Sequence, residues 1–158
     1  SGEWGKVSGT APLHYGGITK EAWSVGEDGS LQKIPYFWVA SRAKLGTPVG
    51  VTTFTGEAAP AVRGLLDKVP SGLHPSGDVG LFPCFTRGVN MYGEENVESD
   101  AIAGVMKNAR IYGMFAHGEL GPSTYSGFLD SIEKTSCTQH SGTTILSVHT
   151  SAEGKDEF

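Results

Sequence analysis

The sequence predicts an α+β fold, with a mixed, largely antiparallel sheet and two main helices packed on one face of that sheet. Runs rich in aromatic and β-branched residues, typical of strands, are interrupted by two segments whose apolar residues repeat with a helical period. In the second half of the chain the order helix, strand, helix, strand, strand favours helices on one face of a sheet. In the first half, short strand-like runs flank a hairpin-type Asp28-Gly29 dipeptide, which favours antiparallel pairing.

Strand signals dominate the N-terminal third of the chain. The segment IPYFWVA is dense in aromatic and β-branched residues, so it is expected to form a strand with at least one buried face. The GEDGS segment at 26–30 is a turn, and a second turn at 45–48 precedes another strand. The expected strands are 10–15, 22–25, 34–40 and 49–54.

Two segments, 57–69 and 94–109, carry apolar stripes at helical spacing. Pro60 fits only within a first helical turn, so the first helix begins no earlier than about Glu57. Asn96 or Ser99 is the expected N-cap of the second helix, where Glu98 and Asp100 favour the positive helix end. The stripes are Ala58, Val62, Leu65, Leu66 and Val69 in the first, and Val97, Ala101 and Val105 in the second.

Three more strands are expected, at 78–88, 110–116 and 143–149. The first is strongly apolar, but Pro83 removes one ladder hydrogen bond, which predicts a bulge or an edge position. The polar segment 151–158 is expected to be a fraying tail.

Composition excludes several classes of function. With 158 residues the chain suits one domain, and its 23 glycines without a period indicate many turns. The net charge of −5 and the lack of a basic cluster argue against nucleic-acid binding, and no apolar run approaches a membrane span of about 20 residues. The two cysteines and five histidines lack metal-ligand spacing, so no metal site or cofactor is expected, and distant cysteines suggest reduced thiols.

Two of the apolar segments end in glycine-bearing loops with polar side chains. If the strands are neighbours, Cys84, Arg87, His117 and Glu119 could cluster at one end of the sheet, where such folds hold ligands. Arg87 and Glu119 could then grip a zwitterion such as an amino acid. Alternatively, Arg87 and Glu119 form a salt bridge that joins the two loops. The glycines of the GELG segment are expected to permit backbone conformations with positive φ.

Cysteine chemistry is a further alternative. Cys84 with His117 could form a catalytic pair, although no recognisable nucleophile motif accompanies them. The competing interpretation is that Cys84, between Pro83 and Phe85, is an inert buried thiol.

Four motifs together resemble the C-terminal domain of the FIST family (F-box and intracellular signal transduction). They are GLFPCFTRG at 80–88, Tyr92-Gly93, Glu98-Ser-Asp-Ala101, and YGMFAHGELGP at 112–122. The resemblance covers about 25–150, whereas 1–30 matches nothing in the family pattern and is an extension or the start of the domain. Pro83 and Thr86 depart from the pattern.

The resemblance implies a non-enzymatic sensory or recognition module, cytoplasmic or nuclear. In bacteria, domains of this type are expected to bind small ligands such as amino acids in signal transduction. Domains that accompany an F-box would instead recruit protein substrates to a cullin-type ubiquitin ligase. The family's N-terminal domain and an F-box are not in the sequence, so the chain is expected to be a fragment of a longer protein or an unusual stand-alone copy. The missing N-terminal domain and the F-box machinery are then the expected partners. The predicted ligand- or partner-binding residues are Cys84, Arg87, Gly88, Tyr92, His117, Gly118, Glu119 and Gly121.

Overall fold

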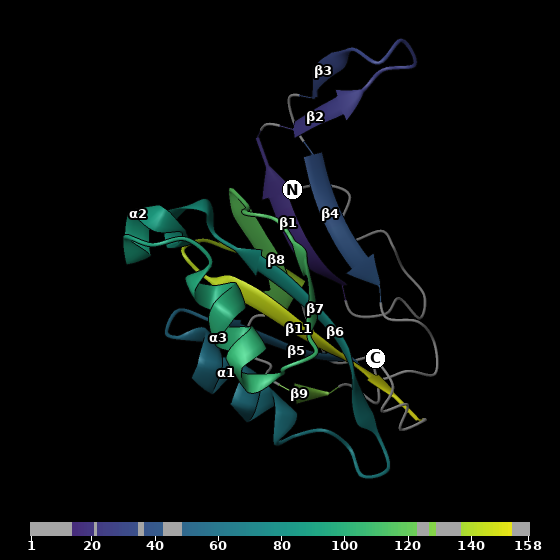
Figure 1. Ribbon diagram of the computed structural model, residues 1–158, viewed down its shortest axis with the longest axis vertical. Coiled ribbons are helices and arrows are strands. Elements are labelled where there is room, and N and C mark those ends of the chain that lie inside the picture. Colours follow the sequence, from purple (N-terminus) through teal and green to yellow (C-terminus); the bar gives the residue numbers. More distant parts are fainter. Residues whose placement is uncertain are drawn as a thin grey trace.

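A computed structural model describes residues 14–20, 22–34, 37–42, 49–122, 127–128 and 137–152 of the chain. Its elements form an α+β arrangement: helices α1 (Ala58–Leu66) and α3 (Val97–Val105) lie on one face of a five-stranded sheet (Figure 1). A four-stranded sheet packs on the opposite face. The predicted fold class, including two main helices on one face of a mixed sheet, is confirmed.

The five-stranded sheet is mixed because one pair of its strands is parallel. β6 and β7 run parallel, and the other neighbouring strands are antiparallel. Across the sheet the strands are β7 (Arg110–Gly113), β6 (His74–Pro83), β11 (Thr144–Ser151), β5 (Val49–Phe54) and β9 (Gly127–Phe128).

The four-stranded sheet is antiparallel throughout, and a two-stranded hairpin projects beyond it (Figure 1). The hairpin turn is the predicted one: Gly29 has φ +79°, and the Ser30 amide donates to Asp28 Oδ1 at 3.0 Å. The sheet order is β10 (Cys137–His140), β8 (Gly118–Pro122), β1 (His14–Thr19) and β4 (Phe37–Arg42), and the hairpin is β2 (Ala22–Val25) with β3 (Leu31–Ile34).

Successive side chains of the central strands point to opposite faces of the sheet, so the domain has two separate hydrophobic cores. On β6, Val79 and Leu81 face the helices, whereas Phe82 faces the four-stranded sheet. The helix-side core also contains the buried stripe of α1 and the Ile102 side chain of α3. The core between the sheets is Tyr15, Val49, Val51, Phe82 and Ile145, with Met114 packed against it.

Helix α1 follows the prediction closely, since Glu57 is its N-cap and Pro60 lies in its first turn. The second predicted helix is shorter than expected. A four-residue helix, α2 (Val89–Tyr92), precedes it, and Asn96 occupies the N-cap of α3 with φ +61° but without a side-chain capping bond. Ser99 Oγ instead donates to the Asn96 carbonyl.

The prediction of a bulge or an edge position at Pro83 is wrong. β6 lies between β7 and β11, and Pro83 is its last residue, so the missing N–H falls where the ladder ends. The chain continues as a 3₁₀ helix, η2 (Phe85–Arg87), instead of extending the strand to 88.

Some expected elements fall partly outside the described residues. The strand expected at 10–15 is described only from His14, as the start of β1. The 34–40 run is divided between β3 and β4, and the tail from 153 onward also lies outside. Within the part of the chain that the structure describes, no helix is long and apolar enough to span a bilayer.

Candidate functional site

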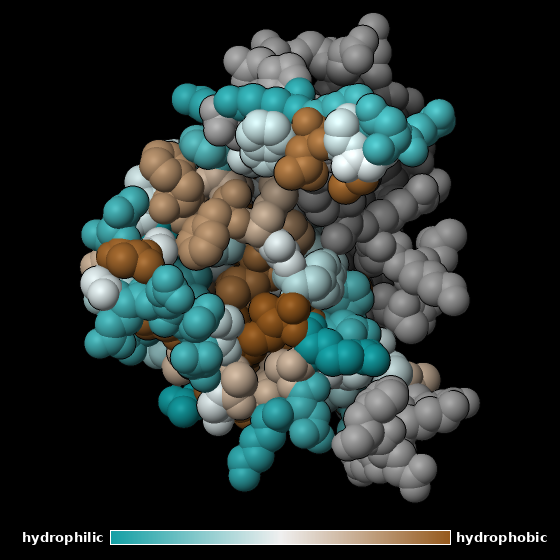
Figure 2. All heavy atoms as spheres, turned by 45° about the horizontal axis from the view of Figure 1, so that its top comes forward, coloured by the Kyte–Doolittle hydropathy of each residue, from teal (hydrophilic) through white to brown (hydrophobic). Residues whose placement is uncertain are grey.

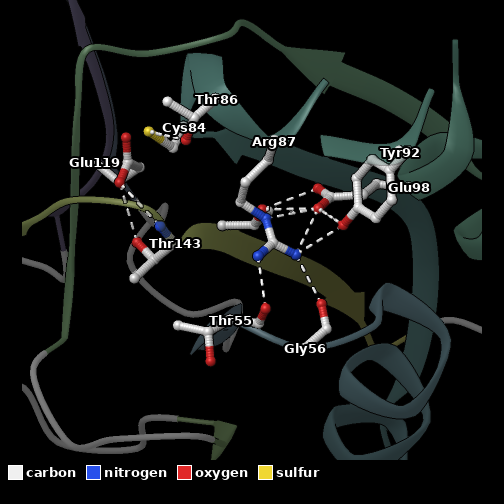
Figure 3. A network of polar contacts seen from close by, with 10 residues as sticks. Thr55, Gly56, Cys84, Thr86, Arg87, Tyr92, Glu98, Glu119 and Thr143 are labelled. Carbon is white, nitrogen blue, oxygen red and sulfur yellow. Dashed lines mark hydrogen bonds and ion pairs between the residues drawn. The ribbon is translucent and has the colours of Figure 1, made fainter. Parts of the chain in front are cut away.

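The ends of β6 and β7 lie side by side, which meets the condition set for a cluster of side chains after the two glycine-bearing segments. Their parallel pairing runs from Asp78 opposite Arg110 to Leu81 opposite Gly113, and a further bridge joins Cys84 to Ala116. The loops that follow therefore leave the sheet at the same end. Beyond that point the predicted side chains separate into two groups (Figure 3).

Arg87 is the centre of the first group and is almost completely buried, with 2% of its surface exposed. Its Nε donates to Glu98 Oε1 at 2.8 Å, and Nη1 donates to the Thr55 carbonyl at 2.6 Å. Nη2 donates to the Gly56 carbonyl at 2.7 Å and to the Tyr92 hydroxyl at 2.9 Å. Every nitrogen of the guanidinium group therefore already has a partner in the protein.

Glu98 is the anion of this network and is 7% exposed. It accepts from the Tyr92 hydroxyl at 2.7 Å and from Thr144 Oγ1 at 2.9 Å. Burial, together with the hydrogen bond to Glu98, raises the pKa of Tyr92 to about 12, so the phenol stays protonated and donates. We call Arg87, Tyr92, Glu98 and Thr144 the buried network; it ties η2, α2, α3 and β11 to the segment after β5.

A salt bridge between Arg87 and Glu119, one of the alternatives left open by the sequence, is wrong. The 3₁₀ turn after β6 directs Arg87 toward the start of α3, and its ion pair is with Glu98. The expected place of Glu98 in the first turn of α3 is confirmed. The pairing itself had no signal in the sequence, because it depends on how the turn packs against the helix.

Glu119 belongs to the second group, on β8, and its side chain is fully buried. Its Oε2 accepts from the Thr143 amide at 3.3 Å and from Thr143 Oγ1 at 3.1 Å, while its Oε1 has no hydrogen-bond partner among the described residues. Burial raises the pKa of Glu119, and hydrogen bonds from Thr143 and Cys84 offset part of that shift. Cys84 is a free, buried thiol that also accepts from Thr86 Oγ1 at 3.1 Å.

His117 lies exposed at the surface, away from this buried carboxyl group. Its ring stacks on Phe85 with the ring centroids 4.5 Å apart, and the Lys20 amide donates to its Nδ1 at 3.3 Å. The neighbour of His117 is thus Phe85, whereas the neighbours of Cys84 are Thr86 and Glu119.

The glycines of the GELG segment serve close packing, not positive φ. Gly118 and Gly121 are not among the described glycines with positive φ. A Cβ on Gly118 would lie 2.5 Å from Gln139 Nε2, and one on Gly121 would lie 2.6 Å from Ile145 Cδ1. The expectation of positive φ at these positions is wrong, because both glycines lie within strand β8. Close packing is strongest at Gly121, which lies against the buried Ile145, whereas the atom next to Gly118 is the flexible end of Gln139.

A pocket of about 550 Å³ opens beside the buried network. Its walls come from η2, α2 and the start of α3 on one side, and from β7 and the residues after it on the other. Figure 2 shows apolar side chains, brown and tan, gathered in the middle of one face among polar ones. Three of the predicted site residues, Arg87, Gly88 and Tyr92, line this pocket, whereas the other five are not among its described lining residues.

Sequence reasoning missed a cluster of two tyrosines and a histidine, one of which, Tyr112, lines the pocket. The Tyr15 and Tyr112 hydroxyl groups lie 3.0 Å apart, and each lies 2.8 Å from His149 Nε2. Burial lowers the pKa of His149, with a partly compensating effect of Asp78. The three residues come from β1, β7 and β11, so only the tertiary structure brings them together, where they hold Tyr112 against the pocket.

The described residues contain no group of three or more His, Cys, Asp or Glu side chains able to hold a metal ion. Comparison with protein-family models and with curated proteins finds no match for the chain. The resemblance to the FIST C-terminal domain therefore stays a prediction from the motifs.

Proposed function

We propose that this chain is a non-enzymatic intracellular recognition domain of the FIST type, which binds a small organic ligand in the pocket beside α2 and α3. The observation that carries the proposal is the pocket itself. Its volume of about 550 Å³ lies within the range of roughly 300–1,000 Å³ typical of small-molecule sites. Its lining is largely apolar with a few polar groups, as in such sites.

The buried network supports this proposal because it makes one wall of the pocket rigid. Arg87 joins the Thr55 and Gly56 carbonyls to Tyr92 and Glu98, so the residues around η2 and the start of α3 are fixed before any ligand arrives. A preformed site avoids part of the ordering cost of binding. Arg87 acts in this proposal as a positioning residue.

A recognition role also agrees with the state of the polar groups at the pocket. Arg87, Tyr92 and Glu98 bond to one another, so they are engaged in structure and not arranged around a nucleophile. The Cys84 side chain is buried, and its sulfur accepts a hydrogen bond from Thr86 Oγ1. Amino acids are the ligand class that the family resemblance suggests, and signal transduction is the corresponding process.

Recruitment of a protein substrate, in an F-box-associated ubiquitin ligase adaptor, is the second candidate. It is favoured by large apolar side chains exposed beside the pocket, since contiguous patches of this kind mark protein interaction sites. These side chains are Phe85, Val89, Met91, Tyr112 and Phe115, which are 38–55% exposed.

A thermal-shift screen against amino acids and other small metabolites tests the small-ligand proposal. A ligand at 100 times its Kd should stabilise the fold by about 2.7 kcal/mol, which corresponds to a rise in Tm of roughly 5–10 °C for a chain of this length. The rise should disappear in Phe115→Ala, which removes a half-exposed pocket side chain. It should persist in Val25→Ala, which removes an exposed side chain from the β2–β3 hairpin.

A hit that Phe115→Ala leaves unchanged would place the ligand elsewhere and contradict the proposal. A screen without any hit would favour the second candidate. In that case Phe115→Ala should weaken capture of a protein substrate in a defined binding assay, while Val25→Ala should not.

A further inference from the structure

We propose that the ligand of this pocket is an organic cation, an amine carried on an aromatic or branched apolar body. The inference rests on the proposed small-ligand function and names the chemical class. It departs from the zwitterion grip expected from the sequence, in which Arg87 would pair with a carboxylate. Three features of the pocket support it: its formal charge, the engagement of Arg87 and the aromatic walls. A fourth feature, the N-terminal dipole of α3, opposes it only weakly.

The described lining residues carry an excess of negative charge. They include one arginine, Arg87, and three glutamates, Glu94, Glu95 and Glu98, so the formal sum is +1 − 3 = −2. Arg87 and Glu98 neutralise each other through an ion pair of 2.7 Å at the base of the pocket. The remaining charge is that of Glu94 and Glu95, which are exposed.

Arg87 is poorly suited to receive a ligand carboxylate. Each of its nitrogens donates to a protein oxygen, and two of the acceptors are backbone carbonyls of Thr55 and Gly56. A bidentate carboxylate would need two parallel N–H groups directed at it. Reaching that geometry would require breaking the contacts that hold η2 in place.

One feature opposes a cation, because the N-terminus of α3 also borders the pocket, at Asn96 and Val97. A helix N-terminus acts as roughly half a positive charge. Glu98 and Asp100, both in the first turn, already lie near that charge. The positive charge of the helix end is therefore smaller than the combined negative charge of Glu94 and Glu95, and Glu98 and Asp100 already compensate part of it.

The apolar body of the ligand would contact aromatic and aliphatic walls. Phe85, Tyr112 and Phe115 line the pocket and are 38–55% exposed, so their rings are accessible. Aromatic rings attract cations through the negative face of the ring, in addition to removing apolar surface from water. Leu81, Ile111 and Met114 complete the apolar lining.

A matched series of phenyl compounds separates charge from shape. The probes are 2-phenylethylamine, 2-phenylethanol, 3-phenylpropionate and phenylalanine, titrated by calorimetry, with ¹H–¹⁵N shifts of the Gly88 and Gly113 amides reporting the location. The amine should bind about threefold to tenfold more tightly than the alcohol, the range for one or two partly exposed charge pairs. The propionate should bind most weakly.

A charge-neutralising variant isolates the role of the two glutamates. Glu94→Gln combined with Glu95→Gln should reduce the affinity for the amine to that for the alcohol and leave the alcohol unchanged. Glu27→Gln, in the turn of the β2–β3 hairpin, removes one exposed glutamate elsewhere and should change neither.

The outcomes that overturn this proposal differ from those that overturn the proposed function. Equal affinity for amine and alcohol, or tightest binding of the propionate, would refute a cationic ligand while leaving a small-ligand pocket. A metabolite hit that maps to this pocket, without binding of the amine up to ~10 mM, would do the same. If no probe and no metabolite binds, both the cationic ligand and the proposed small-ligand function are refuted.

Discussion

Replacing Arg87 by methionine should destabilise the domain by about 3–5 kcal/mol. The substitution keeps an apolar stem of similar length but leaves Glu98 as a buried carboxylate without its cation, and the Thr55 and Gly56 carbonyls without their donor. Breaking a buried ion pair by removing one partner costs this much because the remaining charge has lost its compensation.

The size of the expected destabilisation follows from the burial of the Arg87 and Glu98 side chains. Arg87 is 2% exposed and Glu98 is 7% exposed, so water screens the lost interaction very little. For a domain of about 150 residues, 1 kcal/mol corresponds to roughly 2–4 °C in Tm. The Tm of Arg87→Met should therefore fall by on the order of 10 °C.

Thermal and urea unfolding, followed by far-UV circular dichroism, measure this effect. Arg110→Met is the control, since Arg110 pairs with Asp78 at 2.9 Å but is 57% exposed, and its loss should cost less than about 1 kcal/mol. A double-mutant cycle completes the test. Arg87→Met combined with Glu98→Leu should cost clearly less than the sum of the single variants.

A loss below about 1 kcal/mol for Arg87→Met, equal to that of the control, would refute the buried network as a structural element. Strict additivity in the cycle would also refute it, because independent side chains show no coupling.

Three further predictions concern the carboxyl group, a glycine and the free thiol. Burial raises the pKa of Glu119 above its ordinary 4.5, so its contribution to stability is present below pH 4.5 and is lost as pH rises through the raised value. Glu119→Gln should therefore gain stability relative to the parent as pH rises in urea unfolding, and a constant difference from pH 4 to 8 would contradict this. Gly113→Ala should destabilise the domain by at least about 2 kcal/mol, because the new Cβ would lie 1.7 Å from the Leu81 carbonyl oxygen. The control is Gly64→Ala, in open space on α1, which should stabilise the domain by about 1 kcal/mol. Similar melting curves for the two variants would be evidence against the close packing at Gly113. In a Cys137→Ser background, Cys84 should react slowly with iodoacetamide in the native protein, because its side chain is buried. A rate like that of a free thiol would contradict this burial, and only a rate faster than that of a free thiol would support a cysteine-dependent enzyme.

The candidate site was partly predictable from the sequence. The motifs identified the two chain segments whose ends meet, and the structure pairs those segments as parallel neighbours. They did not predict which side chains face one another beyond the strand ends. Arg87 turns to Glu98 because of the 3₁₀ turn after β6, whereas Glu119 points from β8 toward Thr143.

The sequence by itself determined the local structure of this protein wherever a short-range signal was strong. The stripe of α1 and the place of Pro60 defined that helix, and Asp28-Gly29 defined the hairpin turn, because periodicity and backbone preference act within a few residues. Only the tertiary structure decided that the strands form two packed sheets, and that the pocket lies between η2, α2 and β7. Sheet order and pocket walls join residues distant in the chain, and such contacts depend on long-range packing that no local pattern encodes.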